Sequence, residues 1–173
     1  MKKRFALMAA LIGGMTLMAA CDDDDDNNGD SSLSAASYAG ETSMTIMGMD
    51  FSTKDTVSVA MDAKGEYAEV SFAARSVTVA AMGNMAFGIG EFKIDSVEVS
   101  KTSNGFTLTR RNKFSTEVSV SMGSQPAATR TATGTFGESV IKGTGAEIEL
   151  TGLTMGSMPA TLDFSFEGTK IEK

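Results

Sequence analysis

Apolar and polar residues alternate along most of the chain from Tyr38 onward. In several segments every second residue is apolar, while the residues between are polar or small; the clearest are 57–61, 68–72, 118–120 and 162–166. A period of two is typical of strands with one face toward a core, and no segment shows the helical period of 3.6. The pattern therefore predicts an all-β domain.

Glycine-containing turns divide this domain into eight expected strands. One kind comprises Asn104-Gly105, a strong hairpin signal, and looser turns at 62–65 and 142–145. The other kind joins methionine to glycine at 47–49, 82–85, 122–123 and 155–158, and the two kinds alternate. We expect strands at about 38–47, 49–61, 66–82, 85–101, 105–122, 127–141, 146–155 and 159–168.

The apolar parity shifts within these strands between Ala74 and Val77, near Gly90, and between Ile94 and Val97. Such shifts indicate β-bulges, which bend and coil a sheet. An antiparallel meander of eight strands that bends in this way closes into a barrel, and closure removes its exposed edges. The expected fold is an up-and-down, lipocalin-like β-barrel.

A membrane-spanning barrel has the same period, with its apolar face outward. Such barrels carry aromatic girdles at both interfaces. This chain has no Trp and only Tyr38 and Tyr67, so the sequence favours a barrel with an apolar interior.

The first 20 residues have the organisation of a leader. Residues 2–4 are basic, residues 5–17 form an apolar run too short to span a bilayer, and two alanines precede Cys21. This segment resembles a bacterial type II signal peptide, which implies lipidation of Cys21. Met18 stands where that motif usually has leucine. Ordinary signal cleavage near Ala20, leaving a free thiol, is the alternative.

Cys21 is the only cysteine, so the chain cannot form an internal disulfide. Lipidation would cap an otherwise exposed thiol, and two or three acyl chains would hold the protein at a membrane essentially permanently. We therefore expect a signal peptide at 1–20, a lipidated tether at 21–37 and a barrel domain at 38–173.

Five consecutive acids follow the cysteine: Asp22, Asp23, Asp24, Asp25 and Asp26. They resemble the acidic signal that sends lipoproteins of Bacteroidetes-type Gram-negative bacteria to the cell surface, which implies an outer-membrane lipoprotein facing the exterior. A solvated, disordered tether explains the same composition. Residues 24–30 also match half of a calcium loop, but Ala35 stands where its bidentate acid should be, so we expect no metal there.

The charge balance argues against nucleic acid as a partner. Without its leader the chain carries 12 basic and 22 acidic residues, and from Tyr38 onward 12 basic and 16 acidic residues. No basic cluster interrupts this acidic domain, whereas phosphate recognition requires one.

Three short motifs carry a family resemblance: Tyr38-Ala39-Gly40, the segment 90–99 and the segment 164–168. They resemble the calycin-like β-barrel lipoproteins of such bacteria, over essentially the whole mature domain. The resemblance implies a lipocalin-like barrel and brings no catalytic residues.

Candidate catalytic groups are few. The chain has no histidine and no G-x-S-x-G motif. Glu147 and Glu149 share one face of a strand, but Ile148 and Leu150 mark the other face as the interior, so we expect solvated glutamates and not a glycosidase pair. The sequence predicts a protein that is not an enzyme and needs no cofactor.

Seven methionines cluster at the methionine-glycine turns: Met47, Met49, Met82, Met85, Met122, Met155 and Met158. Alternation of the turns places them at one end of the barrel. The simplest interpretation is that flexible thioethers fill an irregular barrel end. A soft rim that binds a hydrophobic ligand or partner is the alternative, and copper binding is weaker because no histidine or thiolate accompanies the thioethers.

Arg110 is a candidate interior charge. If parity continues from Leu108 to Val118, Arg110 points inward, where it could neutralise a ligand carboxylate. A further bulge over 110–113, with every charge in solvent, is the simpler interpretation because an unpaired interior charge is costly.

Two functions fit these observations. One is a non-catalytic lipoprotein that binds a small apolar ligand in the barrel or a partner on the methionine rim. The other is a structural or accessory protein of a cell-surface complex. An interior cavity of ~300 Å³ or more would favour the first; a solid core between Val59, Val70, Phe72, Ile94, Val120 and Phe164 would favour the second.

Overall fold

The computed structural model describes residues 35–46, 48–80, 84–156 and 161–172, and for Met85 it describes only the backbone. These residues form twelve strands and no α-helix. The strands are β1 (Ala35–Ile46), β2 (Met49–Met61), β3 (Tyr67–Phe72), β4 (Arg75–Val79), β5 (Met85–Ile89), β6 (Phe92–Thr102), β7 (Gly105–Thr109), β8 (Phe114–Met122), β9 (Ala128–Phe136), β10 (Ser139–Lys142), β11 (Gly145–Met155) and β12 (Leu162–Lys170).

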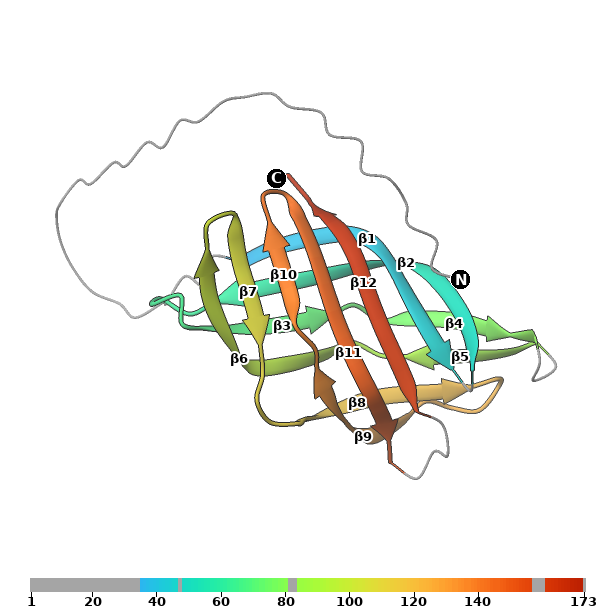
Figure 1. The fold of residues 1–173 in the computed structure, drawn as a ribbon. Helices are drawn as coiled ribbons and strands as arrows, with labels where there is room; N and C mark the ends of the chain where they lie inside the picture. The colour runs from blue at the N-terminus through green and yellow to red at the C-terminus, as the bar shows by residue number, and fades with distance from the viewer. Residues whose placement is uncertain (1–34, 47, 81–83, 157–160, 173) are drawn as a thin grey trace, which may run out of the picture. The chain divides into compact units, whose positions relative to one another are not determined.

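The twelve strands follow the eight expected ones, because four of those are interrupted. β3 and β4 form one long strand, as do β5 and β6, β7 and β8, and β9 and β10. Successive long strands pair antiparallel, and β12 pairs with β1 (Figure 1). The ring β10-β7-β6-β3-β2-β1-β12-β11 closes through pairing of β10 with β11. The predicted closed, eight-stranded antiparallel barrel is confirmed.

Two of the three predicted parity shifts are confirmed. Ile89 and Phe92, on either side of Gly90, are both buried, and so are Ile94 and Val97. Between the latter two, Ser96 has a φ of 54°, and the register between β3 and β6 shifts. The extra residue at each place bends the strand, as a bulge does.

The third shift lies earlier than predicted. Phe72 and Arg75 both point inward, whereas Ala74 is exposed, so the phase changes between Phe72 and Arg75 and not between Ala74 and Val77. Our expectation was wrong because it placed no charged residue inside the barrel.

The predicted boundary between tether and barrel was also displaced. β1 begins at Ala35 and not at Tyr38; Ala35 is paired with Ala60, and Ser37 with Ser58. The hydroxyl oxygens of the two serines are 2.9 Å apart. Residues 35–37, whose small side chains led us to place them in the tether, join the sheet because their backbone pairs with β2. Cys21 and the acidic run Asp22 to Asp26 lie outside the described residues.

Both ends of the described chain meet at one end of the barrel. Tyr38 is paired with Lys170, and the Ile171 amide donates a hydrogen bond to the Ser37 carbonyl at 2.8 Å. The β2–β3, β6–β7 and β10–β11 turns lie at this end, which we call the terminal end (Figure 1). The described residues of the methionine-glycine turns lie at the opposite end, which we call the methionine end, as the alternation predicted; they are Gly48, Met49, Met122, Gly123, Met155 and Gly156.

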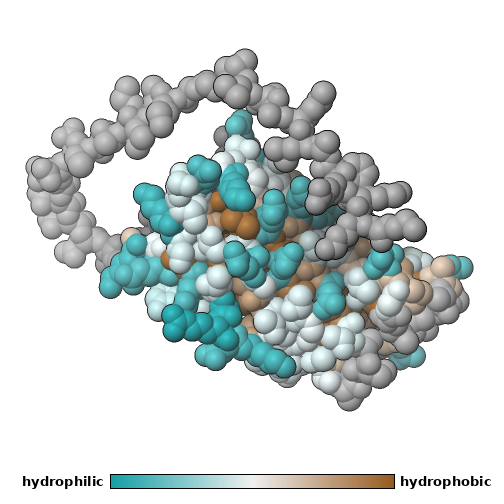
Figure 2. All heavy atoms as spheres, in the orientation of Figure 1, coloured by the Kyte–Doolittle hydropathy of each residue, from teal (hydrophilic) through white to brown (hydrophobic). Residues whose placement is uncertain are grey.

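The interior is apolar and the outside polar. Thirty buried hydrophobic side chains form one continuous cluster. On the outside, Figure 2 shows mainly hydrophilic residues over β10, β11 and β12, with apolar colour visible between them. A membrane-spanning barrel has the reverse arrangement.

Gly40 tests the seam between β1 and β12. A Cβ atom at Gly40 would collide with the backbone of Glu167 and Gly168, its neighbours across the seam. We predict that Gly40→Ala lowers the free energy of unfolding by about 1–3 kcal/mol, because backbone cannot move aside without separating the strands. Urea unfolding measures this. Ala39→Ser, at the exposed neighbouring position, should stay within ~0.5 kcal/mol; equal effects would contradict the close approach.

Candidate functional site

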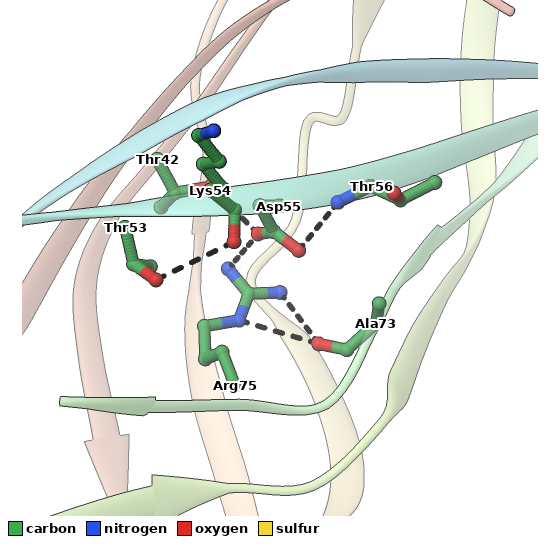
Figure 3. Close-up of polar contacts among 7 residues, drawn as sticks. All are labelled: Thr42, Thr53, Lys54, Asp55, Thr56, Ala73 and Arg75. Carbon is green, nitrogen blue, oxygen red and sulfur yellow. Dashed lines mark hydrogen bonds and ion pairs between the residues drawn. The ribbon is translucent and has the colours of Figure 1, made fainter.

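The most distinctive group of side chains is an ion pair inside the barrel, between Asp55 on β2 and Arg75 on β4 (Figure 3). Nη1 of Arg75 lies 2.6 Å from Oδ2 of Asp55, and the side chains are 2% and 1% exposed. Thr42 donates its hydroxyl proton to Oδ2 at 2.6 Å, and the Thr56 amide donates to Oδ1 at 2.7 Å. Both carboxylate oxygens are therefore occupied.

The guanidinium is held from its other side by backbone. Nε and Nη2 of Arg75 both donate to the carbonyl oxygen of Ala73, at 3.3 and 3.1 Å. Nη1 makes no hydrogen bond of ordinary geometry, so its contact with Asp55 is an ion pair by proximity. Burial lowers the pKa of Arg75, and the charge of Asp55 opposes that change.

Three phenylalanine rings enclose this guanidinium. Cζ of Arg75 lies 5.3, 5.7 and 5.4 Å from the ring centroids of Phe72, Phe92 and Phe164. Phe72 and Phe92 stack at 4.8 Å with an interplanar angle of 11°. A cation over aromatic faces gains electrostatic attraction that partly replaces its lost hydration. The carboxylate, the Ala73 carbonyl and the three rings therefore surround the guanidinium, and Nη1 is held by its ion pair with Asp55.

Our sequence reasoning missed this pair, although parity contained the signal. Val57 and Val59 point inward on β2, and the same period reaches Asp55; Val77 and Val79 point inward on β4, and their period reaches Arg75. When two residues of opposite charge both fall on inward positions of their strands, they can be expected to form an ion pair inside the barrel.

Arg110, the interior charge that we singled out, occupies an intermediate environment. Its side chain is 18% exposed; Nη2 lies 3.7 Å from Oδ1 of the exposed Asp95, while Nε and Nη1 are enclosed without a partner among the described residues. Arg111, Asn112 and Lys113 are exposed. The simpler interpretation places every charge of 110–113 in solvent. It holds for the charges of Arg111 and Lys113 and fails for Arg110.

The described methionines of the turns pack against the core. Met155 is 0% exposed, and Met49 and Met122 are partly buried against the apolar cluster. Met47, Met82 and Met158 lie outside the described residues, and so does the side chain of Met85. The three described positions favour the space-filling interpretation of the thioethers.

The six residues chosen to test for a cavity are buried: Val59, Val70, Phe72, Ile94, Val120 and Phe164 are between 0% and 6% exposed. A cavity large enough for a ligand would leave the side chains around it with surface that a water molecule could touch. These side chains are buried within one continuous hydrophobic cluster instead, so the centre of the barrel is solid.

Two hollows along the described strands lie on the outside of the barrel. One, of about 1190 Å³, spans β11, β12, β1 and β2; the second, of about 490 Å³, adjoins it at Ser43 and Ser165. Along the floor of the first runs a row of directly paired residues from four strands, Lys54, Glu41, Glu167 and Glu147. Neighbouring glutamates repel each other, so this row favours a partner that brings positive charge.

No catalytic or metal-binding arrangement emerges from the part of the chain described. Glu147 and Glu149 are exposed on the outer face, as predicted. No group of three or more acidic or cysteine side chains among the described residues is placed to hold a metal ion. Within the same residues, no helix is long and apolar enough to cross a membrane.

The buried ion pair gives the first test of this site. Replacing only Asp55 by Asn, or only Arg75 by Met, should lower the free energy of unfolding by about 3–5 kcal/mol. In each variant the charged partner that remains is left unpaired in a dry interior. Asp55→Asn combined with Arg75→Met should cost less than either single change. Urea unfolding of the four proteins in a double-mutant cycle measures the coupling.

An exposed ion pair supplies the matched control. Lys93 and Glu69 lie 3.0 Å apart with side chains 56% and 39% exposed. Replacing either should change stability by no more than about 1 kcal/mol, because solvent screens the pair. Equal losses at the buried and the exposed pair would refute the importance of Asp55 and Arg75.

Arg110 gives the second test. We predict that Arg110→Met raises the free energy of unfolding by about 1–2 kcal/mol, because the two enclosed nitrogens lose hydration without gaining hydrogen bonds. Thermal and urea unfolding measure this change. Arg111→Met, whose side chain is 83% exposed, should be neutral within ~0.5 kcal/mol. A destabilised Arg110→Met protein would show that this guanidinium is satisfied.

Comparisons with protein-family models, with curated proteins and with solved structures found no match for this chain. Its function must therefore be argued from its own residues.

Proposed function

We propose that this chain is a lipid-anchored outer-membrane lipoprotein whose barrel is a non-catalytic scaffold within a cell-surface assembly. The observation that carries the proposal is the solid interior. The barrel centre holds thirty packed apolar side chains and one buried ion pair. A carrier of small apolar ligands needs an accessible pocket, so contacts with other molecules are assigned to the outer surface.

The anchoring part of the proposal rests on the leader. The basic start, the short apolar run and the two alanines before Cys21 resemble a lipoprotein signal peptide, and the aspartates after it resemble a surface-export signal. The barrel geometry is compatible with a tether, since β1 begins at Ala35 on the outside edge of the terminal end. We also propose kinship with calycin-like barrel lipoproteins, on the motifs given above.

The scaffold part rests on where the molecule is hollow and charged. The hollow over β11, β12, β1 and β2 is lined by serine, threonine and glutamate residues, by Lys54 and Asp55, and by glycines and alanines between them. No described group supplies a histidine, a thiolate or an activated serine there. This surface fits recognition of a polar, cationic partner and does not fit acid–base catalysis.

Native mass spectrometry of the protein purified from membranes of its own host tests the whole proposal. We expect a mass equal to residues 21–173 plus a lipid on Cys21, with no additional small molecule bound. The Cys21→Ser variant should retain its leader and carry no lipid. A stoichiometric small-molecule adduct on the barrel would refute the scaffold and support a carrier; a mature chain with a free thiol would refute the anchor.

A further inference from the structure

The terminal end of the barrel carries four exposed lysines: Lys64, Lys101, Lys142 and Lys170. They stand in or beside the β2–β3 turn, the β6–β7 turn, the β10–β11 turn and the end of β12. The four methionine-glycine turns at the opposite end contain neither lysine nor arginine in their sequences. Positive charge is thus concentrated at the end where the chain enters the barrel.

Backbone pairing shows that these lysines follow one another around the barrel opening. Lys142 is paired with Gly105 of the β6–β7 turn, and the Lys170 amide donates to the Thr144 carbonyl at 2.7 Å. On the other side, the Val99 amide donates to the Glu66 carbonyl of the β2–β3 turn at 2.9 Å. We call the four lysines and the turns that carry them the lysine collar.

Four acids lie near the collar, as many as its lysines, and two of them are engaged. Asp62 accepts hydrogen bonds from the backbone amides of Glu66 and Tyr67, at 2.8 and 3.3 Å, and so is committed to its turn. Glu98 is paired with Arg111 at 3.3 Å. The side chains of Glu66 and Glu172 are exposed. With Arg111 counted beside Glu98, five basic groups stand against four acids here, whereas acids outnumber basic residues in the barrel domain as a whole.

Apolar side chains accompany the collar. Tyr67 is 49% exposed and Ile171 is 43% exposed, and they are the large hydrophobic residues most exposed among those described. Tyr67 opens β3, and Ile171 follows β12, so both stand at the terminal end. Lysine with tyrosine and an aliphatic residue is the composition of a surface that rests at a membrane interface.

We propose that the lysine collar, with Tyr67 and Ile171, is a membrane-contact surface that rests on the anionic headgroups of the leaflet holding the anchor. The inference rests on the proposed lipid anchor, since the tether joins the barrel at this same end. Ala35 follows Cys21 by fourteen positions, and a flexible coil of fourteen residues spans about 20 Å. The anchor therefore keeps the collar within reach of the headgroups, and the methionine end points away from the membrane.

Binding of the unlipidated protein to vesicles tests the surface without the anchor. The probe is the mature chain from Cys21 with Cys21→Ser, mixed with vesicles of phosphatidylcholine alone or with phosphatidylglycerol. We expect binding only to the anionic vesicles, weakened by salt. Changing Lys64, Lys101, Lys142 and Lys170 to Gln should lower the partition coefficient by about six hundredfold, since each lysine near such a surface contributes about fivefold.

A variant of equal net charge is the control. Lys54, Lys93, Lys113 and Arg130 are exposed elsewhere on the barrel, and changing them to Gln should leave most of the binding intact. Equal losses in the two variants would refute a localised contact surface. Because this protein carries no lipid, the outcome is independent of whether Cys21 is acylated in the host.

Lysine acylation of the lipidated full protein in anionic vesicles gives the second measurement. The collar lysines should react several-fold more slowly than Lys54 and Lys93, and equal reactivity would overturn the proposal. A third measurement, without vesicles, compares the protein with a variant in which residues 22–26 are changed to Asn. If the collar lysines already resist acylation in solution, and this resistance is lost in the variant, the collar binds the acidic tether and not a membrane.

Discussion

Asp55 and Arg75 must meet inside the barrel, and the path of three strands depends on that contact. β3 pairs with β2 as far as Phe72, and the Ala73 amide still donates to the Thr56 carbonyl at 3.2 Å. The phase change after Phe72 then turns Arg75 inward and leaves the Ala73 carbonyl free to accept two guanidinium hydrogen bonds. Without the bulge, neither the inward cation nor its backbone acceptor would be in place.

This contact constrains more than it stabilises. Taking two charges out of water costs several kcal/mol per ion, which their attraction only offsets when the geometry is good and the remaining atoms are satisfied. Here Thr42, Thr56 and three aromatic rings supply the rest, from β1, β2, β3, β6 and β12. A slipped register would leave a charge unpaired in hydrocarbon, so the pair selects one register among several that an apolar core would tolerate.

The sequence predicted the architecture because closure and topology depend on repeated signals. Alternation over long segments and two kinds of turn specify eight strands and their order, even though each single boundary is imprecise. The site was missed because it depends on two single residues, Asp55 and Arg75. Both occupy inward positions of their strands, where the alternation leads one to expect an apolar residue. Arg110 was easier to notice, since apolar residues flank it on both sides in the same strand, yet its neighbours leave it only half enclosed.

In a closed barrel with a solid core, the inward residues stabilise the fold and the outward residues are free to contact other molecules. Every inward position is committed to packing, and the single cysteine leaves no disulfide to reinforce the fold, so stability must come from about 140 residues of closed sheet. Outward positions carry no such commitment, because each of the eight strands in the closed ring already has a neighbour on both sides. The row of glutamates, the lysine collar and the methionine end can therefore differ in charge without disturbing the core, and that freedom is what the proposed scaffold function requires.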